Sequence, residues 1–464
     1  MDESMEKGWD ISQAMIEANR CLLCYDAPCS KGCPAGTEPA IFIRKLRMKN
    51  ITGAIRAIKE RNILGGVCGA ICPTSMLCEK ECVAANFDRP IRIGKIQRAL
   101  IEHSWKIGFS PLSKYYNEEV KDDFDKIEKV KKEGRKVAII GGGPAGIACA
   151  FELAKFGIKV TIFEEHEKIG GALRYLIPSH RLSNKFLEKE TSELAFMGVE
   201  IKCNTMIKKD DIKTIFEKGY DAIFLSPGLW KSVRLDDRDI KGVYTAHDFL
   251  YSLKEKPEKM KKIVNGKKVA VIGGGSVALD CAESCILYGA KDVYLIYRRS
   301  FSQMLSEENE RICALRKGVH FIMLNQPICY LLDENGRVDK IKLCRTELGN
   351  EDKSGRRAPV EVKGSDWELE VDFVIEAIGS QADEKIKDLN SEIKFDKGLV
   401  VVNDKQETSA KLIFAGGDIT RGPGLVAQAI GDGKAAAKAI IEKLSKEKTK
   451  GKEKSVLVSI SRRC

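Results

Sequence analysis

Half of the cysteines in this chain, eight of 16, lie before residue 83 in two tight groups. Closely spaced thiolates that a distant cysteine completes, with proline after the last cysteine of a run, are typical of iron-sulfur ligation and so of one-electron transfer. Zinc is the alternative, because Cys21 and Cys24 have the paired spacing that zinc prefers. The first group is Cys21, Cys24, Cys29 and Cys33, which precedes Pro34; the second is Cys68, Cys72, Cys78 and Cys82.

A second kind of chemistry is indicated by Val137-Ala-Ile-Ile-Gly-Gly-Gly-Pro-Ala-Gly146, where an apolar run meets a glycine turn. A helix-compatible segment and a strand-like run ending at Glu164 follow, which is the context that a dinucleotide fingerprint requires. Gly141 permits the tight turn, and Gly143 lets backbone N–H groups approach a pyrophosphate. Gly146 allows close helix-sheet packing, and Glu164 stands where a ribose hydroxyl is held. The alternative is a glycine turn in an ordinary α/β protein.

A second fingerprint, Val269-Ala-Val-Ile-Gly-Gly-Gly-Ser-Val-Ala278, repeats the first after 132 residues, counted from Gly141 to Gly273. Its following strand ends in Arg298 and Arg299 instead of an acid. An acid at this place binds a free ribose hydroxyl, whereas arginine pairs with a 2′-phosphate, so the sequence favours NADPH over NADH. The alternative is that both arginines are surface residues at the end of a strand.

Two further stretches could contact a cofactor. Residues 169–174 have too many glycines for a helix and are expected to form a loop, from which an arginine could face the ligand. The run Leu412-Ile-Phe-Ala-Gly-Gly-Asp418 reads as a strand that delivers a carboxylate and backbone donors to a ribityl or phosphate group. A turn that merely closes the strand is the alternative. A helix is expected from Val426 through Gly431-Asp-Gly-Lys434.

Composition excludes several classes of protein. The 464 residues contain 43% hydrophobic residues, enough for several globular cores. The net charge of +11 comes largely from mixed-charge runs without interleaved aromatic residues, so we expect no nucleic-acid partner. The sequence has no apolar run of transmembrane length and begins without the pattern of a signal peptide, so we expect no membrane partner and a cytoplasmic location.

The two fingerprints and the returning strand that ends at Asp418 resemble the architecture of flavoprotein disulfide reductases. The resemblance implies a multidomain chain, an α-helical iron-sulfur domain followed by two Rossmann-like α/β domains, with FAD on the first fingerprint and NADPH on an inserted second domain. One departure is that no redox disulfide lies near either fingerprint, because Cys281 and Cys285 are expected in the core. The expected segments are a helical domain with two clusters at 1–115, a linker at 116–136, FAD segments at 137–240 and 381–442, an NADPH domain at 241–380, and a mobile lysine-rich tail at 443–464.

The resemblance also implies which residues contact each cofactor. For FAD these are Gly141, Gly143, Pro144, Ala145, Gly146, Glu164, Gly171, Leu173, Arg174, Arg181, Gly417 and Asp418. For NADPH, with NADH as a possible substitute, they are Gly273, Gly275, Ser276, Ala278, Arg298 and Arg299.

Taken with the N-terminal cysteines, the chain resembles the electron-entry module shared by the glutamate synthase small subunit and the N-terminal half of dihydropyrimidine dehydrogenase. That family builds two 4Fe-4S clusters from crossed ligands. Ile91-Arg-Ile-Gly-Lys-Ile-Gln97 matches the motif whose glutamine completes the second cluster in dihydropyrimidine dehydrogenases, where glutamate synthase small subunits typically have glutamate. By position, Cys21, Cys24, Cys29 and Cys82 would hold one cluster, and Cys33, Cys72, Cys78 and Gln97 the other, with Cys68 not a ligand.

The resemblance implies an oxidoreductase subunit that takes hydride from NADPH and passes single electrons through two 4Fe-4S clusters. The acceptor would be an FMN-containing catalytic subunit that reduces uracil or thymine, in a hetero-oligomer. Alternatives are a glutamate synthase small subunit, a stand-alone NAD(P)H:acceptor oxidoreductase, or a zinc-binding redox sensor. No residue of this chain is expected to act as a catalytic acid, because electron transfer proceeds through cofactors.

Overall fold

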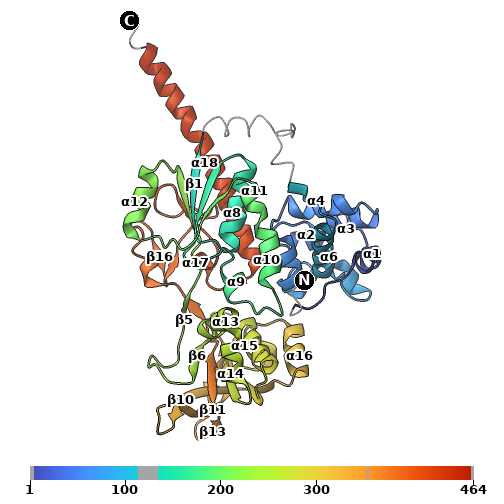
Figure 1. Ribbon diagram of the computed structural model, residues 1–464, viewed down its shortest axis with the longest axis vertical. Coiled ribbons are helices and arrows are strands. Elements are labelled where there is room, and N and C mark those ends of the chain that lie inside the picture. The colour runs from blue at the N-terminus through green and yellow to red at the C-terminus, as the bar shows by residue number, and fades with distance from the viewer. Residues whose placement is uncertain (1–4, 113–133, 353–354, 461–464) are drawn as a thin grey trace. The chain divides into compact units, whose positions relative to one another are not determined.

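The computed structural model describes residues 5–112, 134–352 and 355–460 (Figure 1). The chain divides into two compact units, of which the first comprises residues up to 174, 180–229 and those from 382 on, and the second comprises 175–179 and 230–381. The second unit therefore interrupts the first, as an inserted domain does. Its boundary falls after Leu229 instead of residue 240, because β5 (Lys231–Ser232) pairs with β15 (Ser380–Gln381). The expected linker at 116–136 lies outside the described residues except for its last three.

The N-terminal part of the first unit is helical, as the sequence predicts. Its core contains apolar side chains from α3 and α4, including Phe42 and Ile55. The chain breaks between α3 and α4, because Asn50 caps a new helix by accepting a hydrogen bond from the Gly53 N–H at 2.9 Å. The elements are α1 (Ile11–Asn19), α2 (Pro28–Lys31), α3 (Pro39–Arg47), α4 (Ile51–Lys59), α5 (Gly65–Ile71), η1 (Thr74–Met76), η2 (Val83–Asn86) and α6 (Ile93–Lys106).

The α/β part of the first unit is a five-stranded parallel sheet in the order β18-β4-β1-β2-β3. β1 (Lys136–Ile140) lies in the middle of this sheet and is buried after its first residue, as its apolar sequence predicts. The other elements before the interruption are α8 (Pro144–Lys155), β2 (Lys159–Phe163), α9 (Ala172–Tyr175), α10 (Asn184–Thr191), α11 (Glu193–Phe196), β3 (Glu200–Lys202), α12 (Lys209–Glu217) and β4 (Ala222–Leu225).

The prediction of a loop at 169–174 is wrong for its second half, where α9 forms. Only Gly170 and Gly171 take positive φ values, +133° and +53°, and the helix-forming residues Ala172 and Leu173 follow them directly. The two glycines therefore turn the chain, and the helix begins immediately after the turn.

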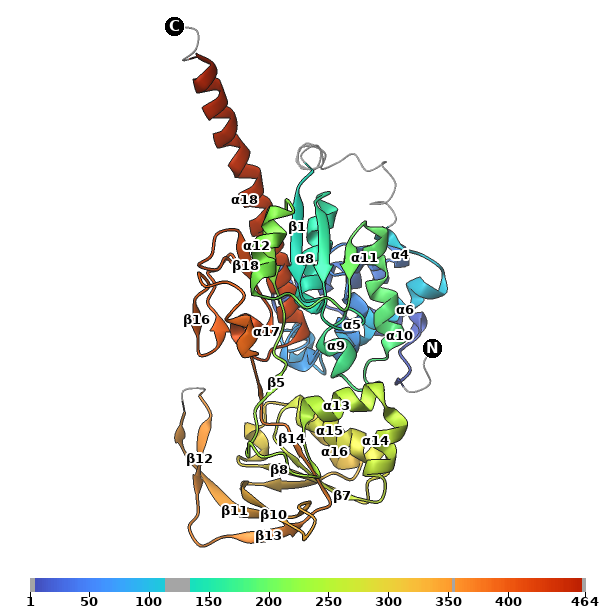
Figure 2. The same cartoon turned by 60° about the vertical axis from the view of Figure 1, so that its left-hand side comes forward.

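The chain returns to the first sheet after the second unit. β18 (Ile413–Ala415) pairs with β4 and completes the sheet, and α18 (Val426–Ile460) packs along α8 (Figures 1 and 2). The helix begins at Val426 as expected but continues through most of the segment expected to be a mobile tail, where Lys, Glu and other helix-forming residues predominate. The remaining elements are η5 (Glu384–Ile386), β16 (Phe395–Asp396), β17 (Leu399–Val400) and α17 (Asp418–Arg421).

The second unit holds another five-stranded parallel sheet, in the order β6-β14-β7-β8-β9, with a smaller antiparallel sheet of β10 to β13 (Figure 2). Cys281 and Cys285 are fully buried in its core, as expected. No helix in the described ranges is long and apolar enough to cross a membrane. The elements are β6 (Val243–Thr245), α13 (Ala246–Glu255), α14 (Pro257–Val264), β7 (Lys268–Ile272), α15 (Ser276–Leu287), β8 (Asp292–Tyr297), η4 (Phe301–Gln303), α16 (Glu308–Arg316), β9 (His320–Met323), β10 (Asn325–Leu332), β11 (Val338–Glu351), β12 (Arg357–Glu361), β13 (Trp367–Glu370) and β14 (Phe373–Glu376).

Candidate functional site

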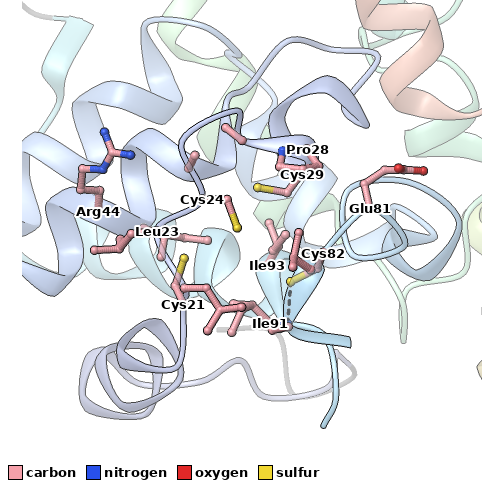
Figure 3. Close-up of a pocket in the computed structure, with 16 residues that line it drawn as sticks. Cys21, Leu23, Cys24, Pro28, Cys29, Arg44, Glu81, Cys82, Ile91 and Ile93 are labelled. Atoms are coloured by element: carbon pink, nitrogen blue, oxygen red, sulfur yellow. Dashed lines mark hydrogen bonds between the residues drawn. The ribbon is translucent and has the colours of Figure 1, made fainter. Parts of the chain in front are cut away.

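Four cysteines of the helical part line one cavity. Figure 3 shows the sulfur atoms of Cys21, Cys24, Cys29 and Cys82 pointing into a common space, although Cys82 is far from the others in the sequence. About 460 Å³ of this space is free of protein atoms, part of it open to solvent. Its walls are largely apolar and include Ile91. Four thiols around an apolar cavity fit the donor set of a 4Fe-4S cluster.

The electrostatics of this group follow from its burial. Burial raises the pKa of Cys29 to about 11, and the neighbouring Cys21 and Cys82 add to the rise. Burial likewise raises the pKa of Cys21, with Cys82 and Cys24 contributing. The Ile91 N–H donates to the Cys82 sulfur at 3.4 Å, a contact of the kind that tunes cluster potentials. Because thiolates are the ligands of iron, metal binding must displace the protons that the raised pKa values of Cys21 and Cys29 favour, so loading is pH-dependent.

Three further cysteines form a second group. Cys33 follows α2 in the sequence, Cys72 caps the C-terminal end of α5, and Cys78 lies between η1 and η2. The pKa of Cys72 is raised first by a hydrogen bond with Cys68, then by burial and by Cys78 and Cys33. Burial raises the pKa of Cys78, and Glu79 and Cys33 add to it. Cys29 of the first group also acts on Cys78, so the two groups are neighbours, and the assignment of Cys33, Cys72 and Cys78 to a second cluster stays a prediction.

The fourth position of the second group has two candidates. Gln97, which is 5% exposed on α6, donates its Nε2 to the Gly65 carbonyl at 2.6 Å. A carbonyl only accepts, so this bond fixes the amide orientation and leaves Gln97 Oε1 as the atom available to iron. Cys68 lies beside Cys72 and accepts a hydrogen bond from Asn62 Nδ2 at 3.3 Å. Within the described ranges, no three His, Cys, Asp or Glu side chains are arranged to hold a single metal ion.

The first fingerprint forms the turn between β1 and α8. Gly141 has φ +98°, and a Cβ there would lie 2.3 Å from the Ser226 carbonyl oxygen. A Cβ on Gly146 would lie 2.1 Å from the Gly141 carbonyl oxygen. Gly143 differs, because its φ is −76° and the nearest atom to its Cβ would be Gly171 Cα at 4.0 Å. Gly141 and Gly146 are thus required by the fold, whereas Gly143 leaves the helix N-terminus open, as a phosphate needs.

Glu164 follows β2 and is buried beside this turn. One carboxylate oxygen accepts the Gly142 N–H at 2.8 Å, and the other accepts the His166 N–H at 2.9 Å. His166 Nδ1 also lies 2.9 Å from that second oxygen, and these contacts together still use only part of the accepting capacity of a carboxylate, which leaves room for a ribose hydroxyl.

The glycine loop after β2 lies against the fingerprint, because a Cβ on Gly171 would be 2.9 Å from Gly143 Cα. Leu173 and Arg174 are both 4% exposed, and Arg174 donates to the Ile169 carbonyl at 2.7 Å and to Glu188 at 3.1 Å. Arg174 therefore also shapes the loop. Arg181 is half-buried after α9.

The returning strand β18 brings Gly417 to the first turn of α8. A Cβ added to Gly417 would lie 3.2 Å from the Cβ of Ala145. Burial raises the pKa of Asp418 to about 6. Asp432 of α18 accepts the Gly417 N–H at 2.9 Å and also pairs with Arg421. The sequence analysis did not assign Asp432 or Arg421 to the site; the available signal was an acid between two glycines, Gly431-Asp432-Gly433, near the start of a helix.

The second fingerprint repeats this design between β7 and α15. Gly273 has φ +144°, and its Cβ would lie 2.3 Å from the Ala377 carbonyl oxygen. A Cβ on Gly275 would meet no atom of the described residues within 4 Å, so the N-terminus of α15 is open. Ala278 is fully buried beneath the turn, and Ser276 Oγ donates to Glu310 at 2.6 Å.

The two arginines after β8 have different surroundings. Arg299 is 5% exposed and donates to Asp352 at 2.6 Å and to the Arg357 carbonyl at 2.9 Å. Arg298 is exposed, and its guanidinium has no bonding partner among the described residues. Arg298 is therefore the freer of the two to meet a 2′-phosphate. The sequence could not reveal Asp352, which comes from a distant hairpin.

Comparison with known proteins agrees with this architecture. Residues 135–433 match the family model described as pyridine nucleotide-disulphide oxidoreductase, and residues 2–109 match dihydropyrimidine dehydrogenase domain II, 4Fe-4S cluster. The glutamate synthase [NADPH] small chain of Escherichia coli is 33% identical, covering 92% of this chain and 91% of its own. The NAD-dependent dihydropyrimidine dehydrogenase subunit PreT of Salmonella typhimurium is 31% identical, covering 94% and 96%. The fold resembles Mycobacterium tuberculosis FprA in complex with NADPH, with a TM-score of 0.58 at 20% identity, covering 68% of this chain and 86% of FprA.

Proposed function

This chain belongs to the pyridine nucleotide-disulphide oxidoreductase family and carries an N-terminal 4Fe-4S domain, and from that premise we propose that it is the electron-entry subunit of a cytoplasmic dihydropyrimidine dehydrogenase. It would oxidise NADPH and deliver single electrons, by way of FAD and two 4Fe-4S clusters, to an FMN-containing partner. That partner would reduce uracil or thymine to the 5,6-dihydropyrimidine. The observation that supports the proposal is that one chain contains both two cysteine groups and two glycine turns that are open to phosphate.

Each cofactor has its residues. FAD would take its pyrophosphate at the N-terminus of α8, over Gly143, with Glu164 at the ribose and the Gly417-Asp418 turn at the ribityl chain. NADPH would bind over Gly275 at the N-terminus of α15, with Arg298 at the 2′-phosphate. FAD, when bound, accepts hydride and releases electrons singly, which is the chemistry that joins a nicotinamide to iron-sulfur clusters.

The contacts between the helical part and the flavin-binding part support electron passage between them. Lys59 is fully buried and pairs with Glu190 of α10 at 2.6 Å and with Glu193 at 3.2 Å. Glu190 also accepts the N–H of Val67 in α5, the helix that leads to Cys72, at 2.8 Å. Burial raises the pKa of Glu190, whereas the two carboxylates raise the pKa of Lys59. A buried pair of this kind costs much to break, which holds α5 against the flavin-binding part.

Exposed side chains surround the first cysteine group. Leu22 is 51% exposed and Tyr25 is fully exposed, and both adjoin the cysteines that line the cavity. Apolar side chains exposed in this way suit contact with another protein. We infer that the Cys33 group faces the flavin and the Cys21 group faces the partner.

A glutamate synthase small subunit is the second candidate, because a protein of that name is as similar over the same length. Gln97 favours the pyrimidine enzyme, since the resemblance places glutamate at this position in the synthase subunits. The names of the relatives differ in their nicotinamide, NADPH in one and NAD in the other, so Arg298 carries the preference for NADPH.

The test is to purify the full chain without oxygen and record its visible spectrum, iron content and reduction by NADPH. Flavin bands over a broad iron-sulfur shoulder, with about eight irons per chain, are expected. Adding an FMN-binding dihydropyrimidine dehydrogenase subunit should start uracil-dependent NADPH oxidation, and the chain alone should show none. Glutamine-dependent glutamate formation with a synthase large subunit would favour the second candidate, and a colourless protein containing zinc would refute both.

Replacing Arg298 by alanine is expected to weaken NADPH binding about 10- to 100-fold, because a hydrogen bond to a charged group contributes ~1.5–3 kcal/mol. NADH binding should change little, since NADH lacks the 2′-phosphate. Titration of each nucleotide followed by flavin reduction measures both constants. Arg316→Ala, which removes an exposed arginine from α16, is the matched control. Equal losses for the two nucleotides would remove the phosphate assignment.

A further inference from the structure

Lys434 of α18 reaches out of the flavin-binding part into the helical part. Its ammonium donates to the Ala35 carbonyl at 2.7 Å and to the Arg61 carbonyl at 2.9 Å. Ala35 is two residues after Cys33, and Arg61 adjoins Asn62, whose side chain donates to Cys68. Lys434 therefore ties the loop after Cys33 to the segment at Arg61, whose neighbour Asn62 contacts Cys68.

The first turns of α18, around Lys434, approach the loop that follows Cys33 closely. A Cβ on Gly431 would lie 2.6 Å from the Pro34 carbonyl oxygen, and a Cβ on Gly36 would lie 3.4 Å from Lys434 Nζ. Gly36 has φ +62°, so the loop after Cys33 turns sharply beneath the ammonium. This approach is too close for larger residues at Gly431.

The same turn of α18 faces the candidate flavin site. Asp432 accepts the Gly417 N–H, and a Cβ on Gly433 would lie 2.1 Å from the Ala145 carbonyl oxygen in α8. Consecutive residues of one helical turn thus contact the turn proposed for FAD and the loop of the second cysteine group.

The charge of Lys434 has no counter-ion in the described structure. Its ammonium forms no ion pair there, and Glu152, an acid that acts on it at longer range, already pairs with Lys155 at 2.9 Å. Burial lowers the pKa of Lys434, and Cys33 is among the groups that raise it. Three thiolates outweigh the positive charge of an oxidised 4Fe-4S core, so a cluster on Cys33, Cys72 and Cys78 would be anionic. Such a cluster would supply the missing negative charge.

We propose that Lys434 is a positioning residue that anchors the Cys33 loop to the flavin-binding helix and whose positive charge stabilises the reduced form of the adjacent cluster. The proposal rests on the two-cluster function above. Adding an electron makes the cluster more negative, and a fixed cation nearby favours that state, so Lys434 raises the reduction potential.

The test is an EPR-monitored redox titration of the full chain with dithionite, which requires neither NADPH nor a partner. Lys434→Gln should shift the midpoint of one cluster to more negative potential and leave the other unchanged. Lys434→Arg, which keeps charge and donors, should lie close to wild type. Lys438→Gln is the matched control, because it removes an exposed lysine one turn further along α18.

Two results would overturn the proposal. One is a Lys434→Gln protein with full iron content whose midpoints match those of wild type. The other is equal loss of iron from Lys434→Gln and Lys434→Arg, whereas loss in the glutamine variant alone supports the anchoring role. A wild-type chain that holds a single cluster would instead refute the proposed function, and the iron content of wild type separates that failure from these.

Discussion

Replacing Gln97 by leucine is expected to remove one 4Fe-4S cluster and leave the other in place, lowering the iron content from about eight to about four per chain. The side chain is buried, and its Nε2 is held by the Gly65 carbonyl, so Oε1 is the only atom that it can offer to iron. Leucine keeps the volume and removes the oxygen. We expect electron delivery to the partner to stop, because the chain of carriers is broken. Iron and sulfide analysis with EPR of the reduced protein measures the loss.

Cys68→Ser is the matched control for this prediction. Cys68 bonds with Cys72 of the second group, yet it should not be a ligand. Its serine variant should keep both clusters with small shifts in the EPR signal. Loss of a cluster from Cys68→Ser, with full iron retained by Gln97→Leu, would reverse the ligand assignment and give this cluster four cysteines.

Gly143→Ala and Gly275→Ala are expected to abolish cofactor binding at one site each without harming the fold. Both glycines have ordinary negative φ values, −76° and −96°, and a Cβ at either meets nothing closer than 4.0 Å among the described residues. The added methyl groups would stand where phosphate approaches the helix N-terminus. Gly143→Ala should therefore yield a stable protein without FAD, and Gly275→Ala a flavoprotein that NADPH no longer reduces. Bound flavin, the rate of reduction by NADPH and thermal melting of the apoprotein measure the outcome.

Gly141→Ala and Gly273→Ala supply the contrast. Their positive φ values and the carbonyl oxygens 2.3 Å from each Cβ strain the backbone whether or not a cofactor binds. Strain of about 1–3 kcal/mol and overpacking of about 1–3 kcal/mol should together lower the free energy of unfolding of the apoprotein. If all four variants melted alike, or if Gly143→Ala retained FAD at normal affinity, the assignment of the open glycines to phosphate would be wrong.

The sequence predicted most of the features that depend only on residues close together in the chain. An apolar run, a glycine turn and a helix are contiguous, so both fingerprints and the start of α18 at Val426 could be located from the sequence. The positions that the sequence missed depend on distant partners. The sequence suggests that Arg299 binds phosphate, but in the structure Arg299 donates to Asp352 of a distant hairpin. The sequence suggests that Asp432 is an ordinary helix residue, but in the structure it accepts a hydrogen bond from the Gly417 N–H.

The two cysteine groups could be predicted only in part from the sequence. Spacing alone indicated iron-sulfur chemistry, but it could not place Cys82 with Cys21, because that pairing depends on how the helices of the domain pack. The family resemblance supplied the crossed pattern, and the structure gathers Cys21, Cys24, Cys29 and Cys82 around one cavity, while the ligands of the second cluster stay a prediction. The short helix α9 was missed because two adjacent glycines outweigh the helix formers that follow them in any local reading.

The bond from Lys434 to Ala35 joins residues 399 positions apart, which has a consequence for how the protein is made. At a ribosomal rate of roughly 5–20 residues per second, the cysteine domain is complete about 15–65 s before the helix that anchors it begins. During that interval both groups of thiols are without their flavin-binding neighbour. Iron insertion can begin on the nascent chain, whereas docking of the loaded domain must wait for the last part of synthesis.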